Sequence, residues 1–210
     1  MIDSYSPAVF DVGNLEDAKA IILTPEGGTT DDRWAKETPY LASLCVEHLD
    51  LGPDKVVVDY GCGIGRMARE LIRQTGCFVI GVDISPSMRA LANVYVNSPG
   101  FLACAPEALP LLGFKFDAAI SVWVLQHCQT PQREIGLIKN GLNEGGKFLV
   151  VNNHGRAVPM RSGNWGTDGV DVRGLLTQQF KVVSELGTLP ADIAPPGLPE
   201  HTFWQVYQKD

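Results

Sequence analysis

The stretch that most constrains the fold is residues 55–73, KVVVDYGCGIGRMARELIR. The β-branched run at 56–58 predicts a short strand buried on both faces, as parallel strands usually are. Glycines then alternate, and the apolar residues that follow recur at helical spacing. The glycines are Gly61, Gly63 and Gly65, and the apolar residues are Ile64, Met67, Ala68, Leu71 and Ile72. The stretch therefore predicts a strand, a tight turn and a helix, the first half of a βαβ unit.

The glycine turn is also a candidate ligand site. Glycine adopts backbone angles that a β-carbon forbids, and it lets a ligand lie close to the main chain. The first N–H groups of the helix favour a negative group such as a carboxylate or a phosphate. Asp59 at the end of the strand adds an acidic group. Because ligands of open α/β sheets bind at the carboxyl ends of strands, we expect a nucleotide-type ligand rather than a merely tight loop.

Length, charge and cysteine content narrow the class of protein. A chain of 210 residues suits one domain, since about 100–200 residues per domain is typical. The formal net charge of −7 provides no broad basic surface for a nucleic-acid partner. Five cysteines without a CxxC pair predict reduced thiols. No apolar run approaches 18 residues and no signal-peptide pattern is visible, so we expect a cytoplasmic protein without a membrane partner.

The rest of the chain alternates between strand-like and helix-like segments. Further strands are expected at residues 77–83, 101–104, 116–124, 147–151, 181–186 and 202–209. Helices are expected at residues 15–23, from about 33 to 52, and at 86–95 and 132–142. Pro39 predicts a kink or two separate helices within the second of these. The alternation predicts a parallel, doubly wound α/β sheet, whose last two strands pair as an antiparallel hairpin.

Five stretches in order resemble class I S-adenosylmethionine-dependent methyltransferases of the small-molecule type. They are VVDYGCGIG, GVDIS, PEALP, FDAAISVWVLQH and GGKFLVV, within about residues 40–152. The resemblance implies a Rossmann-like, three-layer αβα fold with seven strands in the order 3-2-1-4-5-7-6, strand 7 being antiparallel. It implies a single domain over residues 1–210, with 1–50 as an N-terminal helical cap and 153–178 as an acceptor-side insertion.

The resemblance also implies an activity and its cofactor. The expected reaction is methyl transfer from S-adenosyl-L-methionine to an oxygen, nitrogen or carbon of a small-molecule acceptor, without a metal. Asp59, Gly61 and Gly63 would meet the amino acid end of the cofactor. Asp83 follows Gly61 by 22 positions, close to the roughly 20-residue spacing at which an acid accepts hydrogen bonds from ribose hydroxyls. Further residues expected at the cofactor are Trp34, Cys62, Gly65, Ile84, Met88, Ala105, Pro106, Glu107, Ser121 and Val122.

The chain departs from the family pattern where adenine is bound. The family often has an aspartate that meets the adenine amino group, and this chain has Ala105 there. The next residue, Pro106, lacks the N–H that the family often donates to adenine. Adenine recognition is therefore expected to differ locally in this chain, and a modified S-adenosylmethionine stays open as an alternative.

Two histidines are candidates for general base, which an oxygen or nitrogen acceptor requires to lose its proton. His127 directly follows the fourth strand and is the first choice, and His154 after the fifth strand is the second. Trp34 and Trp165 are candidates either for the acceptor pocket or for the core.

Two other functions remain as alternatives at this point. One is a non-catalytic S-adenosylmethionine-binding protein. The other is an NAD-dependent oxidoreductase, which the sequence disfavours because Arg66 stands where its GxGxxG pattern requires a third glycine. A homodimer also stays open.

Overall fold

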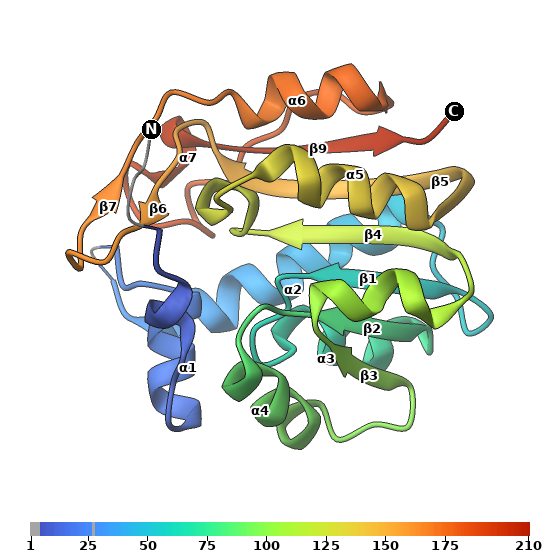
Figure 1. Ribbon diagram of the computed structural model, residues 1–210, viewed down its shortest axis with the longest axis horizontal. Helices are drawn as coiled ribbons and strands as arrows, with labels where there is room; N and C mark the ends of the chain where they lie inside the picture. Colours follow the sequence, from blue (N-terminus) through green and yellow to red (C-terminus); the bar gives the residue numbers. More distant parts are fainter. Residues whose placement is uncertain (1–4, 27) are drawn as a thin grey trace.

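A seven-stranded sheet forms the centre of the computed structural model, which describes residues 5–26 and 28–210 (Figure 1). The strand order is β3-β2-β1-β4-β5-β9-β8. The strands are β1 (Val56–Tyr60), β2 (Phe78–Val82), β3 (Phe101–Cys104), β4 (Phe116–Val122), β5 (Leu142–Asn153), β8 (Lys181–Val182) and β9 (Thr202–Gln208). Neighbours from β3 to β5 pair in parallel, whereas β9 is antiparallel to both β5 and β8. The predicted fold class and strand order are confirmed, with β8 and β9 as the sixth and seventh strands.

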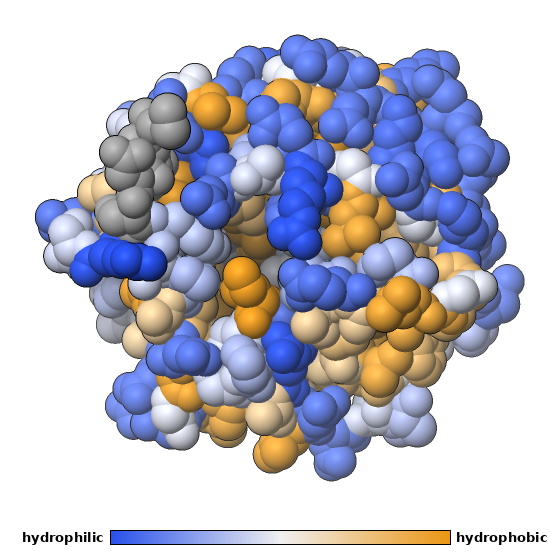
Figure 2. Space-filling view, in the orientation of Figure 1, coloured by the Kyte–Doolittle hydropathy of each residue, from blue (hydrophilic) through white to orange (hydrophobic). Residues whose placement is uncertain are grey.

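Helices cover both faces of the sheet and give the three-layer arrangement. One face is covered by α2 (Thr30–Leu49), α3 (Arg66–Thr75) and α4 (Pro86–Val96). The other face is covered by the 3₁₀ segment η2 (Pro106–Leu112), α5 (Pro131–Gly141) and α6 (Val172–Gln179). Successive residues of a strand point to opposite faces, so Val57 lies in the first core and Val58 in the second. Figure 2 shows a mostly hydrophilic surface over α5 and α6, and hydrophobic side chains gathered near η2, where Leu111 and Phe114 are exposed.

The helix α2 runs through Pro39 without a break, so the alternative of two separate helices is wrong. It also begins earlier than expected, because Thr29 caps it by accepting a hydrogen bond from the backbone N–H of Asp32. Proline removes one helical hydrogen bond. Burial of Leu41 and Cys45 in the first core fastens the half of the helix beyond Pro39, and this tertiary packing outweighs the local signal.

Two short segments lie beyond the carboxyl ends of the parallel strands (Figure 1). The first contains the 3₁₀ turn η1 (Pro7–Phe10) and α1 (Leu15–Ile22), and the second is the hairpin of β6 (Val158–Pro159) and β7 (Trp165–Gly166). They meet where Tyr5 forms a β-bridge with Met160. Ala18 of α1 packs on Ile64 and Met88 in a third, small apolar cluster. The two segments therefore stand over the edge of the sheet where a ligand is expected.

Two short elements complete the described chain. The 3₁₀ turn η3 (Leu125–His127) follows β4, and α7 (Leu198–His201) leads into β9. Among the described helices, none is long and apolar enough to cross a membrane.

Gly65 permits the close approach of α3 and α4, and its substitution tests that packing. The residue has φ +82°, and a β-carbon there would lie 2.3 Å from Cγ2 of Val96. We expect Gly65→Ala to lower the free energy of unfolding by about 2–4 kcal/mol, measured by urea denaturation, through left-handed strain and overpacking. Gly136→Ala is the matched control, because nothing lies within 4 Å of that β-carbon inside α5. The free energy of unfolding of the control should rise by up to about 1 kcal/mol. Equal unfolding midpoints for both variants would contradict this account of Gly65.

Candidate functional site

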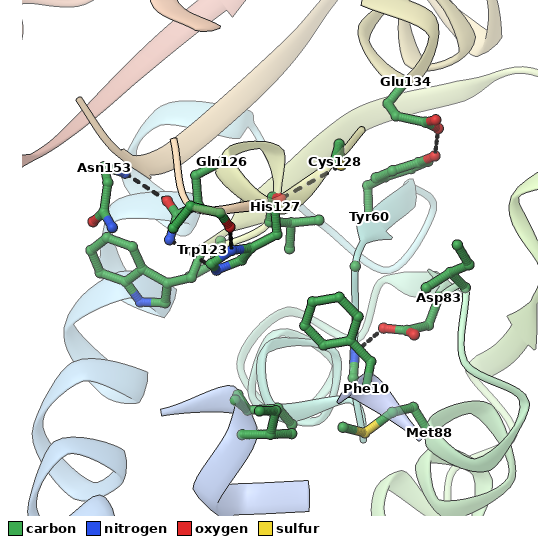
Figure 3. Close-up of a pocket in the computed structure, with 18 of the residues that line it drawn as sticks. Phe10, Tyr60, Asp83, Met88, Trp123, Gln126, His127, Cys128, Glu134 and Asn153 are labelled. Atoms are coloured by element: carbon green, nitrogen blue, oxygen red, sulfur yellow. Dashed lines mark hydrogen bonds between the residues drawn. The ribbon is translucent and has the colours of Figure 1, made fainter. Parts of the chain in front are cut away.

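A cavity of about 450 Å³ lies at the carboxyl ends of β1, β2 and β4 (Figure 3). The glycine turn after β1 and the acid that ends β2 contribute to its wall. The opposite side comes from the residues after β4 and from the two short segments over the sheet edge, which contain η1 with α1 and β6 with β7 and are called the cap segments below. Of the residues expected from the sequence, the cavity is lined by Gly61, Gly63, Asp83, Ile84, Met88, Pro106, Glu107, Val122 and His127.

The glycine turn is fastened to β2 through its main chain. The N–H groups of Gly61 and Cys62 donate to the carbonyl oxygen of Val82, at 2.7 and 3.0 Å. A β-carbon on Gly61 would lie 2.2 Å from Val124, and one on Gly63 would lie 2.6 Å from Ile22. The turn therefore requires glycine at both positions, because side chains from the segment after β4 and from α1 lie directly against it.

Asp83 joins the turn to the start of α4. One carboxylate oxygen accepts from the N–H of Gly63 at 2.8 Å, and the other accepts from the N–H of Ser85 at 2.9 Å. Burial raises the pKa of Asp83, and these two N–H groups oppose the rise. Since a carboxylate has about four acceptor positions, the group retains capacity for ligand hydroxyls at the cavity wall.

Asp59 does not line the cavity, contrary to the expectation from the sequence. It is buried, and its Oδ2 has no hydrogen-bond partner among the described residues. Burial raises the pKa of Asp59 to about 7, and the Arg66 guanidinium opposes that rise. Its neighbour Tyr60 does line the cavity, because adjacent strand residues point to opposite faces. Asp59 thus points away from the cavity.

Other expected residues also lie outside the cavity lining. Trp34 packs edge-on against Tyr95, with the Arg66 guanidinium 5.6 Å from its ring, so it belongs to the packing between helices. His154 is exposed, and its ring lies 5.2 Å from the ring of Phe203 in a tilted arrangement. The remaining residues outside the lining are Cys62, Gly65, Ala105 and Ser121.

An aromatic group closes one side of the cavity. The ring of His127 lies 6.1 Å from Phe10 and 4.9 Å from Trp165, and these two rings are 6.3 Å apart. Tyr5 also lines the cavity, and burial raises the pKa of its hydroxyl to about 12. Trp165 was a candidate from the sequence, whereas the segment of Tyr5 and Phe10 shows no periodic pattern that could have identified them.

His127 is held in one tautomer by three hydrogen bonds in series. Its Nδ1 lies 2.5 Å from the carbonyl oxygen of Ala157, which can only accept, so Nδ1 carries the hydrogen. The N–H of Asn153 donates to Oε1 of Gln126 at 2.7 Å, so the Gln126 amide nitrogen donates to Nε2 of His127 at 3.2 Å (Figure 3). Burial lowers the pKa of His127, and the Ala157 carbonyl opposes the shift. The neutral ring presents its lone pair at Nε2.

A buried ion pair contributes a cation to the cavity. Arg33 lines the cavity and donates from Nε to Glu37 and from Nη1 to the Thr24 carbonyl, both at 2.6 Å. The indole N–H of Trp123 donates to the second Glu37 oxygen at 3.3 Å. Trp123 has φ +62°, a strained conformation for a bulky residue, directly after β4. The sequence did not single out Arg33, because it stands at the start of the expected helix and belongs to no motif.

A further acid, Glu134, lines the cavity on the side of α5. The hydroxyl of Tyr60 donates to Glu134 in the first turn of that helix (Figure 3). Within the described part of the chain, no group of three or more His, Cys, Asp or Glu side chains comes together as a metal site. The cavity therefore combines a glycine turn and a set of aromatic rings with four carboxylates and two arginines, which are Glu26, Asp83, Glu107, Glu134, Arg33 and Arg133.

Comparison with known proteins finds one family model that matches the glycine turn and the strands around it. Residues 58–150 match the model described as a methyltransferase domain. Two curated relatives are each 28% identical. A sterol 24-C-methyltransferase of Gibberella zeae matches over 130 residues, which is 59% of this chain and 33% of that protein. A tRNA U34 carboxymethyltransferase of Cellvibrio japonicus matches over 127 residues, 58% of this chain and 37% of that protein. The matches thus span about a third of the length of these relatives.

Solved structures show the same fold. A geranyl diphosphate C-methyltransferase from Streptomyces coelicolor A3(2), in complex with S-adenosyl-L-homocysteine, superposes with a TM-score of 0.63 at 16% identity. The superposition covers 82% of this chain and 80% of that chain. The family match is to a methyltransferase domain and not to a nicotinamide-dependent oxidoreductase.

Asp59 makes stability depend on pH. Its pKa of about 7 in the folded protein lies above the value near 4 of an unfolded chain. The folded state therefore keeps a proton that the unfolded state releases, and the resulting stability is complete below about pH 4 and lost as pH rises through 7. We expect Asp59→Asn to melt increasingly higher than the parent between pH 4 and pH 8. A melting-temperature difference that stays constant over this range would contradict the assignment.

The tautomer of His127 can be measured directly. We expect ¹⁵N NMR of the imidazole to show hydrogen on Nδ1 and a bare Nε2 at pH 7, with titration below the usual value near 6.5, because the ring is buried. His127→Asn identifies the signals. An imidazolium at pH 7, or hydrogen on Nε2, would contradict the hydrogen-bond series.

Proposed function

We propose, from the match of residues 58–150 to a methyltransferase-domain model, that this chain is a class I S-adenosylmethionine-dependent methyltransferase that transfers a methyl group from S-adenosylmethionine to a small molecule. The observation that carries the proposal is one cavity that contains the glycine turn and Asp83 together. The methylated atom is an oxygen, a nitrogen or a carbon.

The polar groups of the cavity fit the parts of the donor. Asp83 retains acceptor positions for the two ribose hydroxyls. The main chain at Gly61 and Gly63, which lines the cavity, suits the amino acid end, and the Arg33 guanidinium complements its carboxylate. The apolar side chains of Ile84 and Met88 supply flat contact for a base. S-adenosylmethionine has no phosphate, and none of these contacts requires one.

The aromatic lining supports a small acceptor. Phe10, His127 and Trp165 form a group over the part of the cavity that follows β4, and Trp123 adds another ring. Aromatic walls favour flat, largely apolar molecules or cations. The two cap segments meet above the cavity, so a small molecule fits this geometry better than a folded nucleic acid. The net charge of −7 also favours a small molecule over RNA.

The bound donor supplies a sulfonium-activated methyl carbon, and the chain aligns an acceptor with it. His127 is our candidate to take the acceptor proton at Nε2, because Nδ1 is committed to Ala157. The Gln126 amide occupies that lone pair here and has to turn aside for the transfer. The same hydrogen bond is the observation that favours the alternative of a non-catalytic binding protein.

Calorimetry with S-adenosylmethionine and S-adenosylhomocysteine tests the proposal. We expect the parent to bind both, and Asp83→Asn to bind about tenfold to a hundredfold more weakly because hydrogen bonds to a charged group are lost. Asp31→Asn is the matched control, since Asp31 is exposed on α2. Melting curves establish that both variants are folded.

Three results would be decisive against parts of the proposal. No binding by the parent at millimolar ligand would overturn it. Binding without turnover on a panel of phenols, amines and activated carbon acids would favour the non-catalytic alternative. Tight binding of NADH instead would establish an oxidoreductase.

A further inference from the structure

Directly after β3, beside the wall formed by Asp83, positions 105 and 106 offer no hydrogen-bonding side chain. Ala105 has only a methyl group, and Pro106, which lines the cavity, has no N–H. A 6-aminopurine in this part of the cavity presents an N–H₂ donor. Leaving such a donor without a partner in a buried site costs about 1–3 kcal/mol. Another acceptor on the same wall is therefore required.

Glu134 is placed to supply that acceptor. It lines the cavity from the first turn of α5, and its side chain is 14% exposed. The Tyr60 hydroxyl donates to Oε2, and burial, followed by this hydrogen bond and the Glu134 charge, raises the pKa of Tyr60, so the phenol keeps its proton. One carboxylate oxygen is thus fixed by the end of β1. The other oxygen, Oε1, lies 3.7 Å from Arg133, beyond hydrogen-bond distance, and retains lone pairs for a ligand.

Arg133 shows that Glu134 lies close to the start of η2. Its Nη2 lies 3.3 Å from Oε1 of Glu107, and its Nη1 lies 3.7 Å from Oε1 of Glu134. One guanidinium therefore spans the two acids, and Glu107 directly follows Pro106. The Glu107 side chain is 68% exposed and its carboxylate is solvated. The more buried carboxylate of Glu134 forms the stronger hydrogen bond with a ligand, because the local dielectric constant is lower.

We propose that Glu134, oriented by Tyr60, accepts the hydrogen bond from the exocyclic amino group of the donor's purine. The assignment rests on the proposed function and adds a specificity-determining residue to it. Tyr60 is a positioning residue, since it acts through Glu134. The consequence is discrimination at a single purine atom: a 6-amino group is a donor to the carboxylate, whereas a 6-oxo group places an acceptor against it.

Calorimetry with a matched ligand pair tests this assignment. S-adenosylhomocysteine and S-inosylhomocysteine differ in the 6-amino and 6-oxo groups and in the protonation of N1. We expect the parent to prefer the amino ligand by roughly tenfold to a hundredfold. In Glu134→Gln the side-chain amide donates to the 6-oxo group, and the preference should shrink to about threefold or less. Tyr60→Phe keeps the Glu134 carboxylate but removes the hydrogen bond that orients it, so we expect a preference between those of the parent and of Glu134→Gln.

The matched control is Glu144→Gln, at the opposite end of β5, where Glu144 is 77% exposed beside Lys209. It should retain the preference of the parent. A parent that binds the amino ligand without any preference would overturn the assignment and leave the proposed function standing. The assignment is likewise overturned, and the proposed function stands, if Glu134→Gln keeps the preference or if Glu107→Gln is the variant that removes it. A parent that binds neither ligand would overturn the proposed function and this assignment together.

Discussion

The glycine turn depends on its attachment to the end of β2, and the candidate site depends on that attachment. The N–H groups of Gly61 and Cys62 are bonded to Val82, and the N–H of Gly63 is bonded to Asp83. Two neighbouring strands thus end in one rigid unit. The acid held in this unit has its orientation fixed before any ligand arrives, so less conformational entropy is lost on binding.

Much of the fold could be predicted from the sequence because its signals are local and consistent. Apolar runs that end in Asp59 and Asp83, alternating with helices of regular period, predicted a parallel, doubly wound sheet, and the resemblance to class I methyltransferases implied the order of its strands. Proline within α2 was a misleading signal, because tertiary burial of Leu41 and Cys45 outweighs one missing hydrogen bond. The cap segments gave little signal, since Tyr5 and Phe10 belong to no repeating pattern.

The site was predicted only in part, for a reason that concerns strand geometry. A strand of consecutive valines is buried on both faces, so its pattern does not indicate which face each residue occupies. Asp59 therefore looked suitable for a ligand, whereas the pleat directs Tyr60 to the cavity instead. Asp83, which directly follows β2, and His127, in the turn after β4, lie outside the strands and do not depend on this alternation, and both line the cavity. Arg33 and Glu134 come from helices, and no motif in the sequence indicated either side chain.

The bridge between Tyr5 and Met160 has a consequence for the order of folding. It joins residues that lie far apart in the chain, so its closure requires nearly the whole sheet to be in place. During synthesis, the cavity walls formed by Phe10 and Trp165 can meet only after β5 has been made and paired. A ligand that needs both walls then stabilises the finished fold and none of its earlier intermediates. Free ligand would therefore retard unfolding of the completed protein without assisting the earliest steps of its formation.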